Sequence, residues 1–203
     1  METPCPACYP PRMLTPETEQ RLRDYAALLQ TWTRRINLVS AADQPNIWSR
    51  HVLDSLRLVP LIPAGTDRAI DLGSGAGLPG LVLAIATGIS FELIESDHRK
   101  AAFLREAARL TGAPVAVHTT RIEETAIAPA AVVTARALAP LDKLLPMAVP
   151  HLAPGGGMIF PKGTRAAEEV AAARRGWSFG LSIEGGASPI LLIRAPVRVA
   201  AHA

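Results

Sequence analysis

The sequence predicts an α/β fold in which a mostly parallel sheet carries helices on both faces. Three observations predict it. From residue 68 onward, short apolar runs alternate with segments of helical period, and a glycine-rich turn joins the first such run to a helix. Only five residues separate the last two apolar runs. The chain has 203 residues, 49% of them hydrophobic, which suffices for one domain with a sizeable core.

The N-terminal sixty residues are expected to form a tail and a helical lead-in. Residues 1–13 are rich in proline and are expected to be disordered. Thr15-Pro16-Glu17 combines a capping hydroxyl, a proline for the first helical position and an acid, as helix starts do. Apolar residues from Leu22 to Ile36 then mark one helix face, and a second helix is expected from Asp43 to Pro60.

A strand–helix alternation follows over residues 61–195, within a single domain that is expected to span residues 14–203. The predicted strands are Arg68–Leu72, Phe91–Glu95, Val115–His118, Ala131–Ala135, Gly157–Pro161, Ser178–Glu184 and Ile190–Arg194. The predicted helices between them are Leu78–Thr87, Arg99–Leu110, Leu141–His151 and Ala166–Arg175. A parallel crossover needs about a dozen residues, so the last two strands must be antiparallel. The prediction is a seven-stranded sheet that ends in an antiparallel hairpin.

Composition narrows the class of protein. The net charge of +3 permits a polyanionic partner without requiring one. The sequence has neither an apolar run of membrane-spanning length nor a basic–apolar leader, so we expect a soluble, cytoplasmic protein with no membrane partner. Its two cysteines, Cys5 and Cys8, lie in the tail. A structural zinc site needs four ligands, so we expect no metal and an inert tail.

The run AIDLGSGAGLPG, from Ala69 to Gly80, joins strand, glycine turn and helix, the unit that binds phosphates or nucleotides in open α/β sheets. Its glycine spacing also satisfies the dinucleotide pattern. Asp71, however, would repel a pyrophosphate and favour a ligand with an ammonium and a sulfonium, such as S-adenosylmethionine. Pro79, expected in the first helical turn, removes an N–H that an anion would use.

A second acid, Glu95, closes the second predicted strand, twenty residues beyond Gly75. An acid at this place can accept both hydroxyls of an adenosine ribose in either cofactor class. If the glycines served only tight packing, acids at both strand ends would be hard to explain.

Several motifs occur in an order that resembles one bacterial family. Besides the loop Asp71–Gly80, they are Trp32–Ser40, Arg50–Ser55, Arg121–Glu124, Thr134–Ala137 and Pro161–Gly163. Together they resemble the glucose-inhibited division protein B family, also called RsmG, over roughly residues 20–195. Members of that family are 16S rRNA guanine-N7 methyltransferases. The Leu-Pro-Gly ending of the loop separates it from generic methyltransferase loops.

The resemblance implies a class I S-adenosylmethionine-dependent, Rossmann-like fold that acts on 16S rRNA or the small ribosomal subunit, and we expect a monomer. It implies that the backbone at Gly73 and Leu78 contacts the cofactor. Ile122 and Glu123 would hold the adenine edge, and Arg136 would lie near the methionine end or the target base. The expected cofactor-binding residues are Asp71, Gly73, Ser74, Gly75, Gly77, Leu78, Glu95, Ile122, Glu123 and Arg136.

Arg136 is the expected catalytic residue, because an arginine directly after a strand at the cofactor edge is rarely part of a core. Asn37, His51 and Lys162 are expected to contact RNA, although a structural role explains each of them equally well. The candidate phosphate contacts are Arg34, Arg35, Arg50, Arg165, Arg174 and Arg175, any one of which is more often a solvated charge.

The residue types also bear on the chemistry. Both cysteines are in the tail, which excludes a C5-pyrimidine enzyme with a core nucleophile. Thr134–Pro140 lacks the Asn/Asp-Pro-Pro-aromatic motif usual for methylation of exocyclic amines. Guanine N7 has a free lone pair, so attack there needs alignment and no general base. Two alternatives stay open: a methyltransferase of a small molecule or protein, and a non-catalytic module that binds a nucleotide such as NAD.

Overall fold

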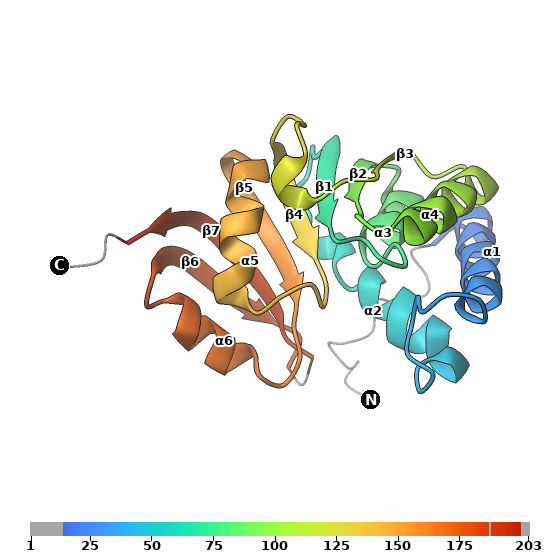
Figure 1. Cartoon of the computed structure of the whole chain (residues 1–203), viewed down its shortest axis with the longest axis horizontal. Coiled ribbons are helices and arrows are strands. Elements are labelled where there is room, and N and C mark those ends of the chain that lie inside the picture. Colours follow the sequence, from blue (N-terminus) through green and yellow to red (C-terminus); the bar gives the residue numbers. More distant parts are fainter. Residues whose placement is uncertain (1–13, 187, 200–203) are drawn as a thin grey trace, which may run out of the picture.

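The structure is a computed structural model that describes residues 14–186 and 188–199; Cys5 and Cys8 lie outside them. Its strands are β1 (Arg68–Leu72), β2 (Ser90–Ile94), β3 (Val115–His118), β4 (Ala130–Ala135), β5 (Leu152–Pro161), β6 (Trp177–Glu184) and β7 (Ile190–Arg198). They form one seven-stranded sheet in the order β3-β2-β1-β4-β5-β7-β6 (Figure 1). β1 to β5 are parallel, whereas β7 is antiparallel to both β5 and β6. The predicted fold class is confirmed.

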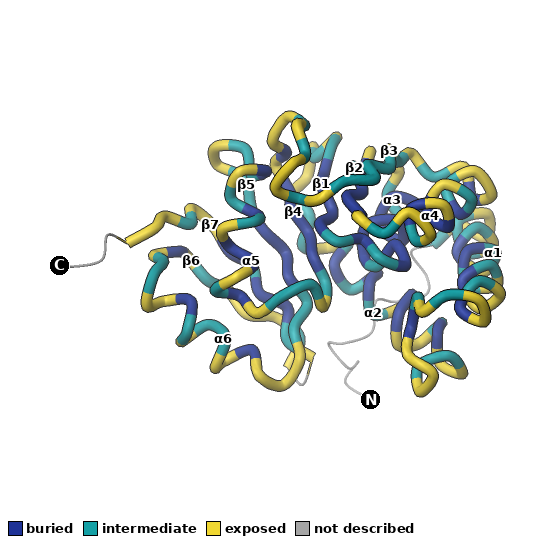
Figure 2. The backbone as a smooth tube through the Cα atoms, in the orientation of Figure 1, coloured by how far each residue is buried: buried dark blue, intermediate teal, exposed yellow. Residues whose placement is uncertain are grey.

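Helices cover both faces of this sheet (Figure 1). They are α1 (Pro16–Thr33), α2 (Leu53–Leu56), α3 (Gly80–Thr87), α4 (His98–Thr111), α5 (Leu141–Ala148) and α6 (Ala166–Ala173). The first four share one apolar cluster, and α5 and α6 share the other. The central strands β1 and β4 are buried along nearly their whole length (Figure 2), as strands covered on both sides must be. Within the described residues, no helix is both long and apolar enough to cross a membrane.

The first helix also supports the glycine turn. Thr15 caps α1 by accepting a hydrogen bond from the Thr18 backbone at 3.1 Å, as its sequence predicts. The helix ends at Thr33, so Ile36 lies in the turn beyond it and not on the helix. Tyr25 is fully buried, and its hydroxyl donates to the Ala76 carbonyl at 2.7 Å. This bond ties the glycine turn to the N-terminal helix.

The expected helix from Asp43 to Pro60 is wrong. The chain instead forms the 3₁₀ turn η2 (Gln44–Asn46), the π-helical turn η3 (Trp48–Val52), the short α2 and the 3₁₀ turn η4 (Val59–Leu61). Over one or two turns, apolar spacing does not distinguish these helix types from one another. The interruption matters because η3 presents a backbone carbonyl and a histidine to the end of β4.

Other boundaries moved by a few residues. Pro79 is the N-cap of α3, so the helix starts at Gly80 and Leu78 lies in the turn before it; Pro79 therefore does not lie within the first helical turn, as predicted. α5 ends at Ala148 and continues as the 3₁₀ turn η6 (Val149–His151). β5 begins at Leu152 instead of Gly157, with a register shift against β4 that apolar spacing does not reveal.

Asp71 and Gly80 pack directly against each other at the base of the glycine turn. Asp71 is fully buried, and its Oδ1 accepts a hydrogen bond from Thr134 Oγ1 at 2.6 Å. A Cβ on residue 80 would lie 2.5 Å from the Asp71 Cβ and 2.7 Å from its Cγ. Real Cβ atoms do not approach that closely, so only glycine fits here. The final glycine of the Leu-Pro-Gly sequence is explained by this contact.

Gly80→Ala should therefore destabilise the fold. The added methyl group must displace Asp71 or α3, which costs about 1–3 kcal/mol for overpacking of this kind. Gly176→Ala is the matched control, because a Cβ there meets no atom within 4 Å and the residue is not in a left-handed conformation. Chemical denaturation of both variants measures the free energy of unfolding; equal midpoints for the two would contradict the packing argument.

Candidate active site

Two cavities adjoin at the carboxyl ends of the parallel strands. The small cavity, of about 300 Å³, lies at the ends of β1, β2 and β4, where the strand order reverses. The large cavity, of about 720 Å³, lies beside it at the ends of β4 and β5. Arg136, Ala137 and Leu138 line both. Ligands bind open α/β sheets at this edge and at this reversal of strand order, so the pair of cavities is the candidate site.

Glu95 is fixed at the wall of the small cavity by the backbone. Its Oε2 accepts from the Gly75 N–H at 2.9 Å, and its Oε1 accepts from the Asp97 N–H at 2.7 Å. The residue is 7% exposed. A carboxylate oxygen has a second lone pair, so each oxygen can accept one further hydrogen bond from a ligand. The side chain is thus held ready between the glycine turn and the start of α4.

The structure brings some of the expected cofactor-binding residues together and leaves others out. Those on the wall of the small cavity are Gly73, Gly75, Glu95, Ile122, Glu123 and Arg136. Ser74 is buried, with its hydroxyl on the Asp71 carbonyl at 3.0 Å. Gly77 packs against Leu81 and Leu104, and Leu78 also lies off the cavity wall. Ser74, Gly77 and Leu78 therefore belong to the glycine turn without lining the small cavity.

Asp71 needs a correction of its own. The sequence suggested that its charge faces the ligand, but the side chain is sealed beneath Gly80 and bonded to Thr134. Burial raises the pKa of Asp71 to about 6, against the opposing effect of the Thr134 hydrogen bond. Its direct task is to anchor the turn to β4.

Sequence reasoning missed several residues of the small cavity. Ser96 and Lys100 follow β2, while Thr120 and Arg121 follow β3, so their places after strands were an available signal. Met147 comes from α5, on the other layer, and no local pattern could have placed it there. Ala137 was missed as well. It has a left-handed φ of +52°, which is uncommon for a residue with a side chain and is often found at functional sites.

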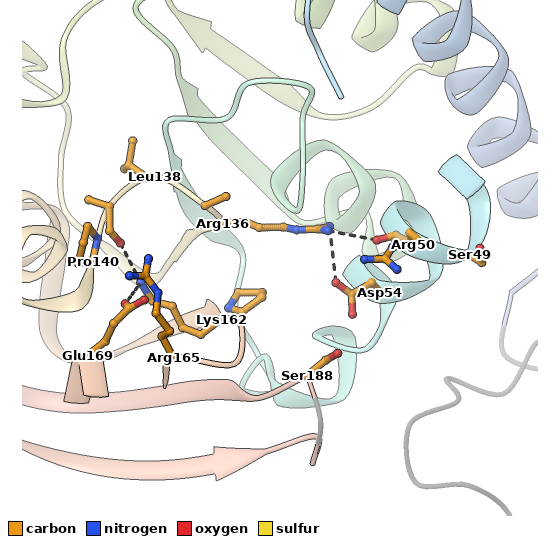
Figure 3. A pocket seen from close by; sticks show the side chains of 14 residues that line it. Ser49, Arg50, Asp54, Arg136, Leu138, Pro140, Lys162, Arg165, Glu169 and Ser188 are labelled. Carbon is orange, nitrogen blue, oxygen red and sulfur yellow. Dashed lines mark hydrogen bonds and ion pairs between the residues drawn. The ribbon is translucent and has the colours of Figure 1, made fainter. Parts of the chain in front are cut away.

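Arg136 connects the two cavities to the N-terminal segment (Figure 3). Its Nη2 donates to the Arg50 carbonyl at 3.1 Å and lies 3.1 Å from His51 Nδ1. Its Nη1 lies 3.6 Å from Asp54 Oδ2. Burial, with the Arg136 charge, lowers the pKa of His51, which favours the neutral ring that can accept this hydrogen bond. His51 thus contacts Arg136 and does not line the large cavity, whereas Arg50 does, paired with Asp43 at 3.2 Å.

Lys162 lines the large cavity but its charge is already compensated (Figure 3). The side chain is 7% exposed; its Nζ lies 2.8 Å from Glu169 Oε2 and donates to the Ala139 carbonyl at 2.8 Å. Glu169 Oε2 also accepts from the Leu141 N–H at 3.0 Å. The pair therefore binds the backbone of the residues before and after Pro140, which precedes α5.

The remaining predicted RNA contacts do not gather at one place. Asn37, Arg34 and Arg35 line a separate cavity between the end of α1 and the start of α4. Arg165 lines the large cavity. Arg174, on the other layer, places its guanidinium 4.8 Å from the centre of the Phe179 ring. Within the part of the chain that the structure describes, no group of three or more His, Cys, Asp or Glu side chains could hold a metal ion.

Sequence comparison identifies relatives along most of this chain. Residues 18–184 match the family described as rRNA small subunit methyltransferase G (GidB). A protein of that name from Paramagnetospirillum magneticum is 55% identical over 166 residues, covering 82% of this chain and 81% of the relative. Its counterpart from Rhodospirillum centenum is 54% identical over 162 residues, covering 80% of this chain and 75% of the relative.

Solved structures share the fold at low sequence identity. Ribosomal protein L11 methylase from Lactobacillus delbrueckii superposes with a TM-score of 0.57 at 20% identity, covering 69% of this chain and 75% of that one. TYW2 from M. jannaschii, solved in complex with AdoMet, gives 0.57 at 16% identity, with coverage of 75% and 78%. The resemblance that the motifs indicated is confirmed: the chain belongs to the rRNA small subunit methyltransferase G family.

Proposed function

We propose that this protein transfers a methyl group from S-adenosylmethionine to N7 of a guanosine near the decoding region of 16S rRNA. The observation that carries the proposal is the shared wall, Arg136 to Leu138, between a cavity of cofactor size and a larger one open to a nucleotide. The names of its relatives support an rRNA substrate. The motif resemblance supports the choice of N7. We expect the protein to act as a monomer in the cytoplasm.

The residues of the small cavity fit the cofactor. Ile94, Ile122 and Met147 offer apolar surface for an adenine ring, and Glu95 offers two fixed acceptor oxygens for ribose hydroxyls. S-adenosylmethionine, when bound, supplies an electrophilic methyl group on a sulfonium. In the proposed arrangement, Arg136 lies between this cavity and the target base.

The large cavity fits a reaction that needs no general base. The two carboxylates among its described lining residues are both occupied: Asp54 accepts from Arg57 at 2.8 Å, and Glu169 is paired with Lys162. A proton-abstracting carboxylate would have to be free to accept a proton. Guanine N7 carries no proton, so the chain has only to align the base with the methyl group and exclude water. This lining favours N7 over an exocyclic amine.

The proposal predicts a specific product. The purified protein, given S-adenosylmethionine and small ribosomal subunits or 16S rRNA from cells lacking the gene, should produce 7-methylguanosine near the decoding region. Nucleoside mass spectrometry of isolated rRNA fragments measures it. Methylation of a free metabolite or a protein, with rRNA unmodified, would favour the small-molecule or protein alternative. Stabilisation by NAD but not by S-adenosylhomocysteine would favour the nucleotide-binding module.

Glu95→Gln should weaken S-adenosylhomocysteine binding by about tenfold to a hundredfold, the usual loss for a hydrogen bond to a charged group. Titration calorimetry measures the dissociation constant directly. Glu124→Gln is the control, because Glu124 is exposed and does not line the small cavity. Equal S-adenosylhomocysteine affinities in the two variants would show that Glu95 does not bind the cofactor.

Lys162→Met tests whether Lys162 positions the wall or binds phosphate. If Lys162 positions the shared wall, the substitution should lower kcat on rRNA about tenfold or more, because misplacement at a reacting centre is costly. The salt dependence of RNA binding should then stay unchanged. Loss of a phosphate contact would instead make the salt dependence shallower, by about 0.7 in the logarithmic slope for a single strand. Lys143→Met, on an exposed lysine of α5, is the control. The double variant Lys162→Met/Glu169→Gln also removes the Glu169 carboxylate, which the single variant leaves partly buried without its cation. It therefore separates the effect of an unpaired, partly buried charge on folding from the effect of a misplaced wall on kcat.

A further inference from the structure

A third cavity, of about 430 Å³, lies where the end of α1 faces the first turn of α4. We call it the basic hollow, and its polar lining includes Arg34, Arg35, Asn37, Asp97, Arg99 and Lys100. Lys100 lines the small cavity as well, so the two openings adjoin. The basic hollow thus adjoins the proposed cofactor cavity and shares no lining residue with the large cavity.

The charges of the basic hollow are not balanced. Its one carboxylate, Asp97, is occupied: Oδ1 accepts from the backbone N–H groups of Arg99 and Lys100 at 2.8 and 3.2 Å, as the N-cap of α4. Its Oδ2 lies 3.7 Å from the Arg99 guanidinium. Among the residues that the structure describes, no carboxylate lies within ion-pair distance of Arg34, Arg35 or Lys100.

The contrast with the large cavity gives this imbalance its meaning. There, three of the four described lining cations, Arg50, Arg136 and Lys162, have a carboxylate partner, and Arg165 has none. Like charges that share a concave surface repel one another, so three uncompensated cations in one cavity favour an anionic ligand. The cavity is also open and polar, and its arginines are exposed, as a site for a hydrated, extended polyanion would be. Asn37 adds an amide that can donate to a phosphate or sugar oxygen.

We propose that the basic hollow binds backbone phosphates of the RNA substrate next to the target nucleotide. This inference rests on the proposed function, because it takes the polyanion to be that RNA. The residues from Arg34 to His51 connect the basic hollow with the η3 turn at the large cavity, so one N-terminal segment borders both. Phosphate contacts position a nucleic acid without reading its sequence. The basic hollow therefore contributes affinity and orientation, and the choice of base is left to the large cavity.

The test is the double variant Arg34→Gln/Arg35→Gln, with small ribosomal subunits from cells lacking the gene as the substrate. We expect KM for the subunits to rise about tenfold or more near physiological salt, with kcat and the S-adenosylhomocysteine dissociation constant unchanged. The logarithmic salt slope of RNA binding should become shallower by about 1.4, for two lost contacts to single-stranded RNA. Arg34→Lys/Arg35→Lys should keep most of the affinity, because such contacts require charge more than shape.

Arg194→Gln/Arg198→Gln is the charge-matched control. Both arginines are exposed on β7, and their substitution removes the same net charge. If this control and the Arg34/Arg35 double variant have the same KM and salt slope, the inference is overturned. Loss of S-adenosylhomocysteine binding in the Arg34/Arg35 variant would also overturn it, by placing these residues at the cofactor instead. Failure of the unmodified protein to methylate rRNA would count against the proposed function itself. If the unmodified protein methylates rRNA and the Arg34/Arg35 variant has the same KM and salt slope as the unmodified protein, the proposed function stands and only the RNA-binding role of the basic hollow is rejected.

Discussion

The segment from Arg136 to Leu141 is held from four directions, and the geometry of both cavities depends on it. Arg136 is held by the N-terminal segment, and Leu138 packs where a side chain on residue 73 would lie, 2.6 Å from its Cδ1. Lys162 holds Ala139, and its partner Glu169 holds Leu141. The left-handed backbone of Ala137 is of the kind that costs about 1–3 kcal/mol and persists only where its surroundings fix it. Here, those surroundings are its own neighbours along the chain.

The same constraint couples parts of the sequence that lie far apart. Glycine is favoured at residue 73 because its φ is +61°, and the end of the Leu138 side chain lies where a Cβ on residue 73 would be. Gly80 must be glycine because Asp71 occupies the place of a Cβ there. The glycine turn is therefore set between the β4 loop on one side and the acid of β1 on the other. Tyr25 adds a hydrogen bond from α1.

The predicted strands and their directions were confirmed because apolar period and connection length determine both. Apolar period and connection length could not predict which charged side chains are buried or which of them pair. Asp71 was expected to face the ligand, but its burial depends on Gly80 and Thr134, which come from two other elements. Lys162 follows β5 and only Glu169 lies on α6, so helical periodicity could not pair them. The η3 turn, whose Arg50 carbonyl accepts from Arg136, was expected as regular helix because apolar spacing does not distinguish the two.

The distribution of charge follows from the proposed chemistry. When N7 of guanine accepts a methyl group, positive charge develops on the base, so an uncompensated cation beside it would raise the barrier. Arg136, on the shared wall, and Lys162, bonded to the Ala139 carbonyl next to it, each have a carboxylate within ion-pair distance. Uncompensated cations can attract RNA without opposing the reaction only if they lie apart from the base. Arg34 and Arg35 meet that condition, because the small cavity separates the basic hollow from the large one. In this arrangement the basic hollow attracts the polyanion from a surface apart from the one where positive charge develops on the base.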